Sequence, residues 1–247
     1  MGEALHEIAP LRQFAWLSLL DAMPDETTLL NFRHLLERHG LAAQMLTAVN
    51  ADLSKRGLLL RQGMIVDATI IHAPSSTKNS SGTRDPDMHQ TRKGNQWFFG
   101  LKAHIGVDRY SGLVHTVVTT AANVADVTQT GALLHGNKKT VFADAGYTGA
   151  DKREALKGKR SDWRIAERRH KVKALPDGEL KDLTVWLEHL RAKVRARVEH
   201  PFRVIKQQFG FHKTRYRGLA KNDAQLNTLF ALSILWMARR RMLALTA

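Results

Sequence analysis

Hydrophobic and polar residues in the middle of the chain follow the period of two that is typical of β-strands. Residues 64–71 form an apolar, β-rich run. Residues 97–107 place every second apolar side chain on one face, and residues 112–120 are rich in Val and Thr. The polar sequence at 108–112 predicts a turn between the last two runs. We therefore expect three strands, the last two of which form an antiparallel hairpin.

Helical spacing dominates residues 1–60. Pro24 and the capping residues beside it precede a predicted helix that ends at Gly40, and a second helix is expected over residues 41–55. Two short helices joined by a glycine form either an αα-hairpin or a DNA-reading helix-turn-helix. The pattern alone leaves both interpretations open.

The rest of the chain alternates short strands with helices. Strands are predicted at residues 140–144 and 162–166, and helices at residues 123–134, 148–156, 181–209 and 224–238. This order predicts an α/β fold with a mixed sheet and flanking helices. It also predicts two regions, a helical segment at residues 1–60 and a larger domain at 61–247. Residues 73–96 are polar and are expected to form a long loop that is functional or mobile.

The charge of the chain changes the picture more than its length does. The 247 residues carry a net charge of +15, and residues 151–220 hold 20 Lys and Arg against 9 Asp and Glu. A polyanionic partner is expected, although charge alone does not separate DNA from RNA or from an anionic membrane. The apolar run at 224–238 is too short to cross a bilayer, so a membrane partner is not expected.

Cysteine is absent from the sequence. The chain therefore has no disulfide, no Cys-ligated zinc and no thiol nucleophile, which fits a reducing compartment such as the cytoplasm.

Three acidic residues suggest metal-dependent chemistry. Asp67 lies inside the apolar run 64–71, where strands avoid Asp, and Asp144 ends the run 140–144. Glu199 lies in the long, basic helix. Carboxylates bind hard divalent cations, and two such ions roughly 3.5–4 Å apart can promote attack on a phosphodiester. Asp144 also precedes Ala145 and Gly146, so it is equally suited to a turn.

The helix around Glu199 adds cations to this hypothesis. Arg195 and Lys206 lie four residues before and seven residues after Glu199, so an α-helix would place all three on one face. There they either hold phosphates or form an ordinary intrahelical salt bridge. Pro201 either kinks the helix just after Glu199 or marks a boundary between two helices.

Other side chains have more than one interpretation. Trp97 stands at a strand start, where core packing is expected in preference to stacking on a base. His104 and His200 lack the paired spacing of zinc ligands. The residues expected to contact DNA phosphates, with a solvated surface as the alternative, are Arg164, Arg168, Arg169, Lys171 and Lys173.

Several longer motifs are together similar to one known family. They lie at residues 75–79, 83–91, 93–97, 102–108 and 198–210. With the three acids, they resemble the DDE transposases of bacterial insertion sequences, specifically the insertion-sequence 5 group. The resemblance covers nearly the whole chain.

This resemblance implies an RNase H-like fold in which Asp67, Asp144 and Glu199 are both the catalytic and the metal-binding acids. It implies two Mg²⁺ ions, for which Mn²⁺ can substitute. Tyr147 matches the tyrosine after the second Asp, and we expect it and Arg203 to contact DNA. Ala192 stands where the wider family has a tyrosine.

The implied activity is cleavage of DNA at transposon ends and transfer of the 3′-OH into target DNA. The partners would be terminal inverted repeats, target DNA and a second copy of the chain, at the bacterial nucleoid in the cytoplasm. Residues 14–36 resemble the later part of the family's N-terminal domain, so the chain resembles a truncated copy. Two alternatives stay open: a nuclease without joining activity, and a DNA-binding remnant that interferes with transposition. An RNA-binding protein would explain the charge but not the Asp inside a strand.

Overall fold

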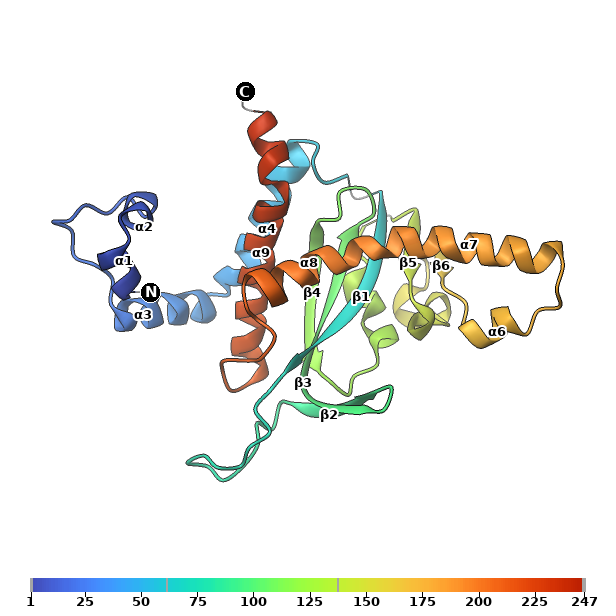
Figure 1. The fold of residues 1–247 in the computed structure, drawn as a ribbon, viewed down its shortest axis with the longest axis horizontal. Coiled ribbons are helices and arrows are strands. Elements are labelled where there is room, and N and C mark those ends of the chain that lie inside the picture. Colours follow the sequence, from blue (N-terminus) through green and yellow to red (C-terminus); the bar gives the residue numbers. More distant parts are fainter. Residues whose placement is uncertain (1, 61, 137, 246–247) are drawn as a thin grey trace. The chain divides into compact units, whose positions relative to one another are not determined.

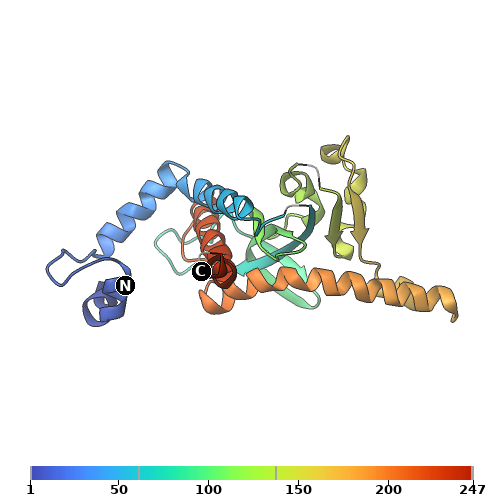
Figure 2. The same ribbon diagram turned by 90° about the horizontal axis from the view of Figure 1, so that it is seen from above.

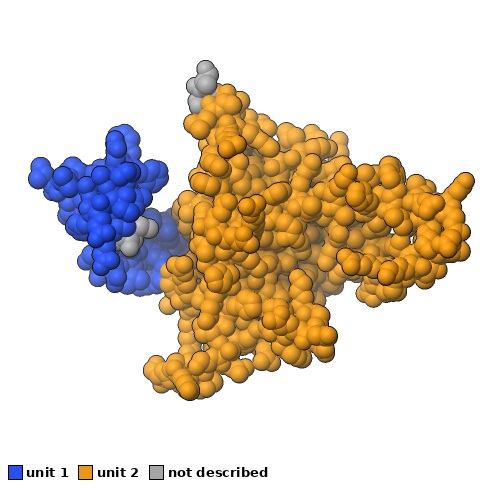
Figure 3. Space-filling view, viewed as in Figure 1, with its two compact units in different colours: residues 1–42 blue, residues 43–247 orange. Residues whose placement is uncertain are grey.

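The computed structural model describes residues 2–60, 62–136 and 138–245 (Figure 1). Residues 1–42 and 43–247 form two compact units (Figure 3).

The first unit is helical, as the spacing predicts. It contains α1 (Gly2–Glu7), α2 (Ala9–Phe14) and α3 (Glu26–Arg38). Asp25 caps α3 by accepting a hydrogen bond of 2.6 Å from the backbone N–H of Thr28. Gly40, with φ of +58°, ends this stretch before α4 (Leu41–Lys55) begins.

In the described part of the second unit, six strands form one mixed sheet. Its order is β2–β3–β1–β5–β6, with β4 also paired to β3. β1 runs antiparallel to β3 and parallel to β5, which confirms the predicted α/β class with a mixed sheet. The strands are β1 (Gly63–His72), β2 (His89–Lys93), β3 (Gln96–Asp108), β4 (Val114–Ala121), β5 (Thr140–Ala143) and β6 (Asp162–Ile165).

The predicted turn between β3 and β4 is confirmed. The buried carboxylate of Asp108 accepts hydrogen bonds from the backbone N–H groups of Tyr110 and Ser111. Gly112 follows with φ of +74°, a conformation that favours glycine. The turn therefore fixes the register of the hairpin.

Three sequence predictions differ from the structure. Part of the expected loop 73–96 is β2, an edge strand of polar residues that no alternation of hydrophobicity reveals. The expected helix at 148–156 is replaced by short 3₁₀ turns, because Gly149 takes a left-handed conformation. The expected helix from Asn123 starts later, without a side-chain cap. The short segments concerned are η1 (Asp126–Gln129), α5 (Thr130–Leu133), η2 (Ala145–Tyr147), η3 (Ala150–Lys152) and η4 (Glu154–Leu156).

One long helical run crosses a face of the sheet (Figures 1 and 2). It consists of α7 (Glu179–Arg195), the 3₁₀ turn η5 (Ala196–Val198), α8 (Glu199–Arg203) and the π-helical turn η6 (Val204–Gln208). The predicted helix 181–209 is therefore present. Its hydrogen-bond pattern changes on both sides of α8, which contains Pro201.

The two faces of the sheet carry separate hydrophobic cores. On one face, Ile65, Leu101 and Ile105 pack with Phe202 of α8 and Phe230 of α9 (Leu219–Ala244). On the other face, the core includes Met64, Val66, Val141 and Tyr147. Successive residues of a strand point to opposite faces, so alternate residues of the same strand join different cores.

The C-terminal helix is longer than predicted, since α9 continues through the arginines at 239–241. α6 (Arg169–Lys173) is a short helix next to α7. None of the helices in the described residues combines the length and the apolar run that crossing a bilayer requires.

We expect Ile105→Ala to lower the free energy of unfolding by about 2–5 kcal/mol, because Ile105 is fully buried where β3 pairs with β1. Urea denaturation followed by circular dichroism measures this change. Leu232→Ala, on the exposed side of α9, is the control, with an expected effect of about 0.5 kcal/mol or less. Equal losses in the two variants would contradict the assignment of the core.

Candidate active site

Parallel strands bring two of the three acids together. β1 and β5 pair with Ile65 opposite Phe142, and continuing this register by two residues aligns Asp67 with Asp144. Asp67 comes two residues after Ile65, and Asp144 comes two residues after Phe142, so each acid points to the same face as that residue. The side chains of Ile65 and Phe142 join the same core. Asp144 also accepts a hydrogen bond of 2.9 Å from the backbone N–H of Gly146, so its expected suitability for a turn is confirmed.

The third acid reaches the same face from the helical run. Val198, Phe202 and Ile205 surround Glu199 in sequence and are buried in the core that contains Ile65. The helix is thereby fixed on the face to which Asp67 belongs. Glu199 itself remains exposed.

Burial raises the pKa of Asp67 to about 7. Repulsion from the carboxylates of Asp144, Glu199 and Asp126 adds to this effect. A hydrogen bond of 2.7 Å from the backbone N–H of Ala68 opposes it. Asp144 and Glu199 therefore lie close enough to Asp67 to raise its pKa.

A cleft of about 370 Å³ lies beside Glu199. Lys206 lines this cleft and donates hydrogen bonds of 2.7 Å to Thr69 Oγ1 and 3.0 Å to the carbonyl of Ile70. Burial lowers the pKa of Lys206, and the positive charge of Lys93 lowers it further. The other residues that line the cleft are Thr69, His200, Phe202, Arg203 and Gln207.

The expected alignment of Arg195, Glu199 and Lys206 is only partly present. Glu199 and Lys206 share the cleft, whereas Arg195 is not among its lining residues. The 3₁₀ turn between Arg195 and Glu199 breaks the α-helical spacing on which the expectation rests. Spacing in the sequence could not reveal this change.

Within the described residues, Asp67, Asp144 and Glu199 form no ion pair, and the hydrogen bonds of Asp67 and Asp144 come from neighbouring backbone. Neutralisation by a cation would relieve their repulsion, so the donor set suits a hard divalent ion. As placed, however, no three His, Asp or Glu side chains in the described residues lie close enough together to hold a metal ion.

Two aromatic residues differ from their expected roles. Tyr147 is fully buried in the core on the other face of the sheet, so its side chain packs there, whereas a contact with DNA was expected. Burial also raises the pKa of its hydroxyl group. Trp97 is 64% exposed, so the expectation of core packing is wrong. The position of Trp97 at the start of a strand does not show whether another element covers its side chain.

Sequence reasoning missed a network beside the acids. Lys102 Nζ donates hydrogen bonds of 2.8 Å to the carbonyl of Val124 and to the carboxylate of Asp126. His104 lies 3.7 Å from the same carboxylate and 2.8 Å from Thr120 Oγ1. Burial lowers the pKa of His104 to about 4, so the imidazole is neutral at physiological pH. Alternation along β3 could have placed the side chains of Lys102 and His104 on one face. No sequence pattern shows that Asp126, in the 3₁₀ turn η1, lies beside them.

The expected phosphate contacts gather around β6 and α6, on the solvent side. Arg168, Arg169 and Lys173 are exposed. Lys171 lies 3.7 Å from Glu167, and Arg164 lies 2.8 Å from Asp162 and also packs over the ring of Phe142. In Figure 1, α6 lies toward the outer end of α7, away from α8.

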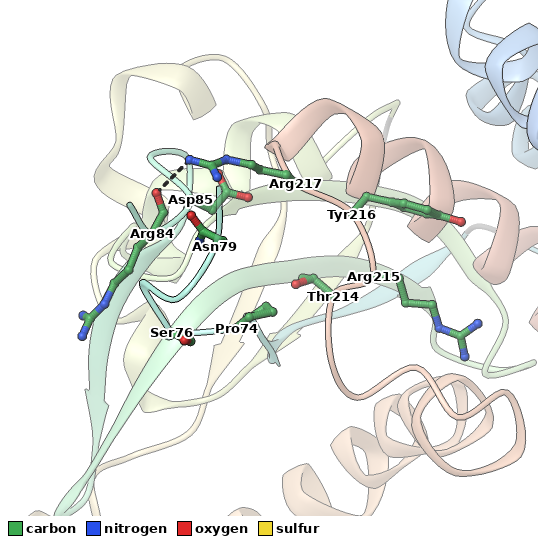
Figure 4. Close-up of a pocket in the computed structure, with 9 residues that line it drawn as sticks. All are labelled: Pro74, Ser76, Asn79, Arg84, Asp85, Thr214, Arg215, Tyr216 and Arg217. Atoms are coloured by element: carbon green, nitrogen blue, oxygen red, sulfur yellow. Dashed lines mark hydrogen bonds between the residues drawn. The ribbon is translucent and has the colours of Figure 1, made fainter. Parts of the chain in front are cut away.

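A second cleft forms where the loop after β1 meets the segment before α9 (Figure 4). Arg217 donates hydrogen bonds to Ser81 Oγ, Thr83 Oγ1 and the carbonyl of Arg84. Asp85 accepts from the backbone N–H of Gly218. These bonds tie the polar loop to the N-terminus of α9.

A family model described as the transposase DDE domain matches residues 59–236, which is most of the chain. The chain belongs to this family. The predicted resemblance to DDE transposases is thereby confirmed, and the mixed sheet with flanking helices agrees with the RNase H-like fold that it implies. Members of the transposase DDE domain family act on DNA and generally use divalent metals. No solved structure matches the chain.

We expect Asp67→Asn to flatten the pH dependence of stability in metal-free buffer. The pKa of Asp67 is about 7 in the folded chain and about 3.9 in an unfolded one, so the folded state binds the extra proton. Its stabilising contribution is complete below about pH 4 and is lost as the pH rises through 7. The variant should be more stable than the parent chain at pH 8, with a smaller difference at pH 4. Parallel unfolding curves across this range would contradict the burial of the charge.

Proposed function

We propose that the chain catalyses metal-dependent cleavage of DNA at transposon ends and joins the released 3′-OH to target DNA. The convergence of Asp67, Asp144 and Glu199 on one face of the sheet, without an ion pair to any described residue, carries this proposal. Residues 61–247 would form the catalytic domain, and membership of the insertion-sequence 5 group is part of the same proposal.

Asp67, Asp144 and Glu199 would hold two Mg²⁺ ions, or Mn²⁺ in their place. When bound, such ions stabilise charge on the attacking and leaving oxygens of a phosphodiester. The raised pKa of Asp67 supports this role, because a cation favours the charged form that burial and repulsion disfavour. Binding would also have to draw the acids closer together than they stand.

The protein's own contribution would be positioning. Lys206, fixed to Thr69 and Ile70, places a positive charge beside Glu199 where a DNA phosphate could lie. Arg203 lines the same cleft. The reaction needs alignment and charge stabilisation, so no nucleophilic side chain is required. Two transposon ends must be held together, and we therefore propose that two copies act as a dimer.

A strand-transfer assay tests this proposal. Purified chain is mixed with Mg²⁺ or Mn²⁺, target DNA and a donor that carries the terminal repeats of the encoding element. Joined product supports the transposase. Cleaved but unjoined donor would instead favour a nuclease, and DNA binding without any product would favour an interfering remnant.

Glu199→Gln should abolish strand transfer and leave DNA binding within a few-fold, because the amide keeps the shape of the side chain and removes its charge. Glu154→Gln, an exposed substitution in a 3₁₀ turn, is the matched control and should retain activity. Product gels measure joining, and fluorescence anisotropy measures binding. Joining by Glu199→Gln at the parental rate would refute the assignment of this acid.

Arg168→Ala combined with Arg169→Ala should weaken DNA binding and reduce its dependence on salt. Each phosphate contact that is lost lowers the slope of log affinity against log salt by roughly 0.9. Arg240→Ala with Arg241→Ala removes the same charge from exposed positions on α9 and serves as the control. Equal slopes for the two double variants would show that net charge, rather than contact near α6, governs binding.

A further inference from the structure

α7 exposes an apolar stripe on its surface. None of its 17 residues is buried, although five apolar residues recur at alternating intervals of three and four. Exposure is 66% at Leu180 and 53% at Leu183, and it falls to 38% at Leu190 as the helix approaches the sheet. This spacing is that of a coiled-coil seam, which normally packs against another helix. The seam consists of Leu180, Leu183, Leu187, Leu190 and Val194.

The inner half of the seam borders a groove. Leu187, Leu190 and Val194 line a cavity of about 550 Å³ between α7 and the strands β5 and β6. Phe142 of β5 lines the cavity from the sheet. Apolar walls around a cavity of this size leave room for side chains that the chain itself does not supply.

The charges of α7 differ between its two halves. The outer half, residues 179–186, carries Glu179 and Asp182, neither of which forms an ion pair with any described residue, and Lys181, which pairs with Asp177. Basic residues line the groove beside the inner half, residues 187–195. Arg164 and Arg191 pair with Asp162 and Glu188, whereas Lys193 has no carboxylate partner in the described part of the chain. The basic residues that line the groove are Arg109, Arg164, Arg191 and Lys193.

We propose that α7 is a self-association surface, in which the outer half of α7 from each copy enters the groove beside the inner half of the partner's α7. The two helices run antiparallel about a two-fold axis. Leucines of the outer half meet the apolar wall of the groove, and the unpaired Asp182 meets the unpaired Lys193. A two-fold interface must be complementary to itself, and the polarity of α7 satisfies that condition.

This surface would bear on the active site, and in that respect the inference rests on the proposed function. α7 continues without interruption through η5 into α8, which begins at Glu199. Docking of α7 against a second copy would therefore hold the helix that presents Glu199. Two active sites would be joined in one assembly, as the pairing of two DNA ends requires.

Sedimentation velocity of the full chain, without DNA or metal, tests the inference over a range of concentrations. The parent chain should form a dimer, and Leu183→Lys should weaken dimerisation by at least roughly tenfold, because the substitution occurs twice in each interface. Val185→Lys is the matched control: Val185 is equally exposed, at 50%, but lies outside the seam on the same helix. It should leave the dimer unchanged.

A charge exchange tests the antiparallel orientation and does not depend on the folding of a core variant. Asp182→Lys and Lys193→Glu should each weaken the dimer, because like charges then face each other across the axis. The two substitutions together restore opposite charges and should restore the dimer. Circular dichroism confirms that each variant is folded.

Three results would overturn the inference: a parent chain that stays monomeric, a dimer that Leu183→Lys leaves intact, or a double charge variant that fails to recover. The strand-transfer assay is scored separately. A monomeric chain with joining activity would overturn this inference alone, and a dimer of the predicted kind without joining activity would overturn the proposed function alone.

Discussion

A carboxylate inside a strand is the constraint on which the candidate site depends. Asp67 stands in β1, between two paired strands, where its charge is poorly solvated and its neighbours include further acids. A buried charge without a counter-ion is costly, and an apolar residue would pack there without that cost. The parallel pairing with β5 then brings Asp144 beside it, and the core on the same face fixes the helix that carries Glu199. The site is thus a local loss of stability that the surrounding cores offset.

The strands of this arrangement were predictable because hydrophobic alternation and topology agree. β1, β3 and β4 each have an apolar face in sequence, and the turn at 108–112 sets the pairing of the last two. Asp67 is conspicuous because it interrupts such a pattern. β2 was missed for the opposite reason: it is a polar edge strand, held by its pairing to β3 and not by burial.

Other features could not be predicted, because they depend on which surfaces finally meet. The exposure of Trp97 and the burial of Tyr147 follow from what covers each position in the fold, and local sequence does not record it. The 3₁₀ turn η5 lies between Arg195 and Glu199 and shifts the register of these two residues from that of a continuous α-helix. Propensity rules contain no information on so small a shift. For the same reason, sequence identifies the acids more readily than their mutual geometry.

The helical run from α7 to η6 is held unequally at its two ends. Lys206 fixes the inner end to β1 through two hydrogen bonds, whereas the outer half of α7 buries no residue. Glu199 lies between these ends, on a segment whose helical geometry is already irregular. The acids share one face without being close enough to hold a metal ion. Val198 and Phe202 are buried on either side of Glu199, so the core holds this part of the run, and the outer half of α7 is the part that another surface could still cover.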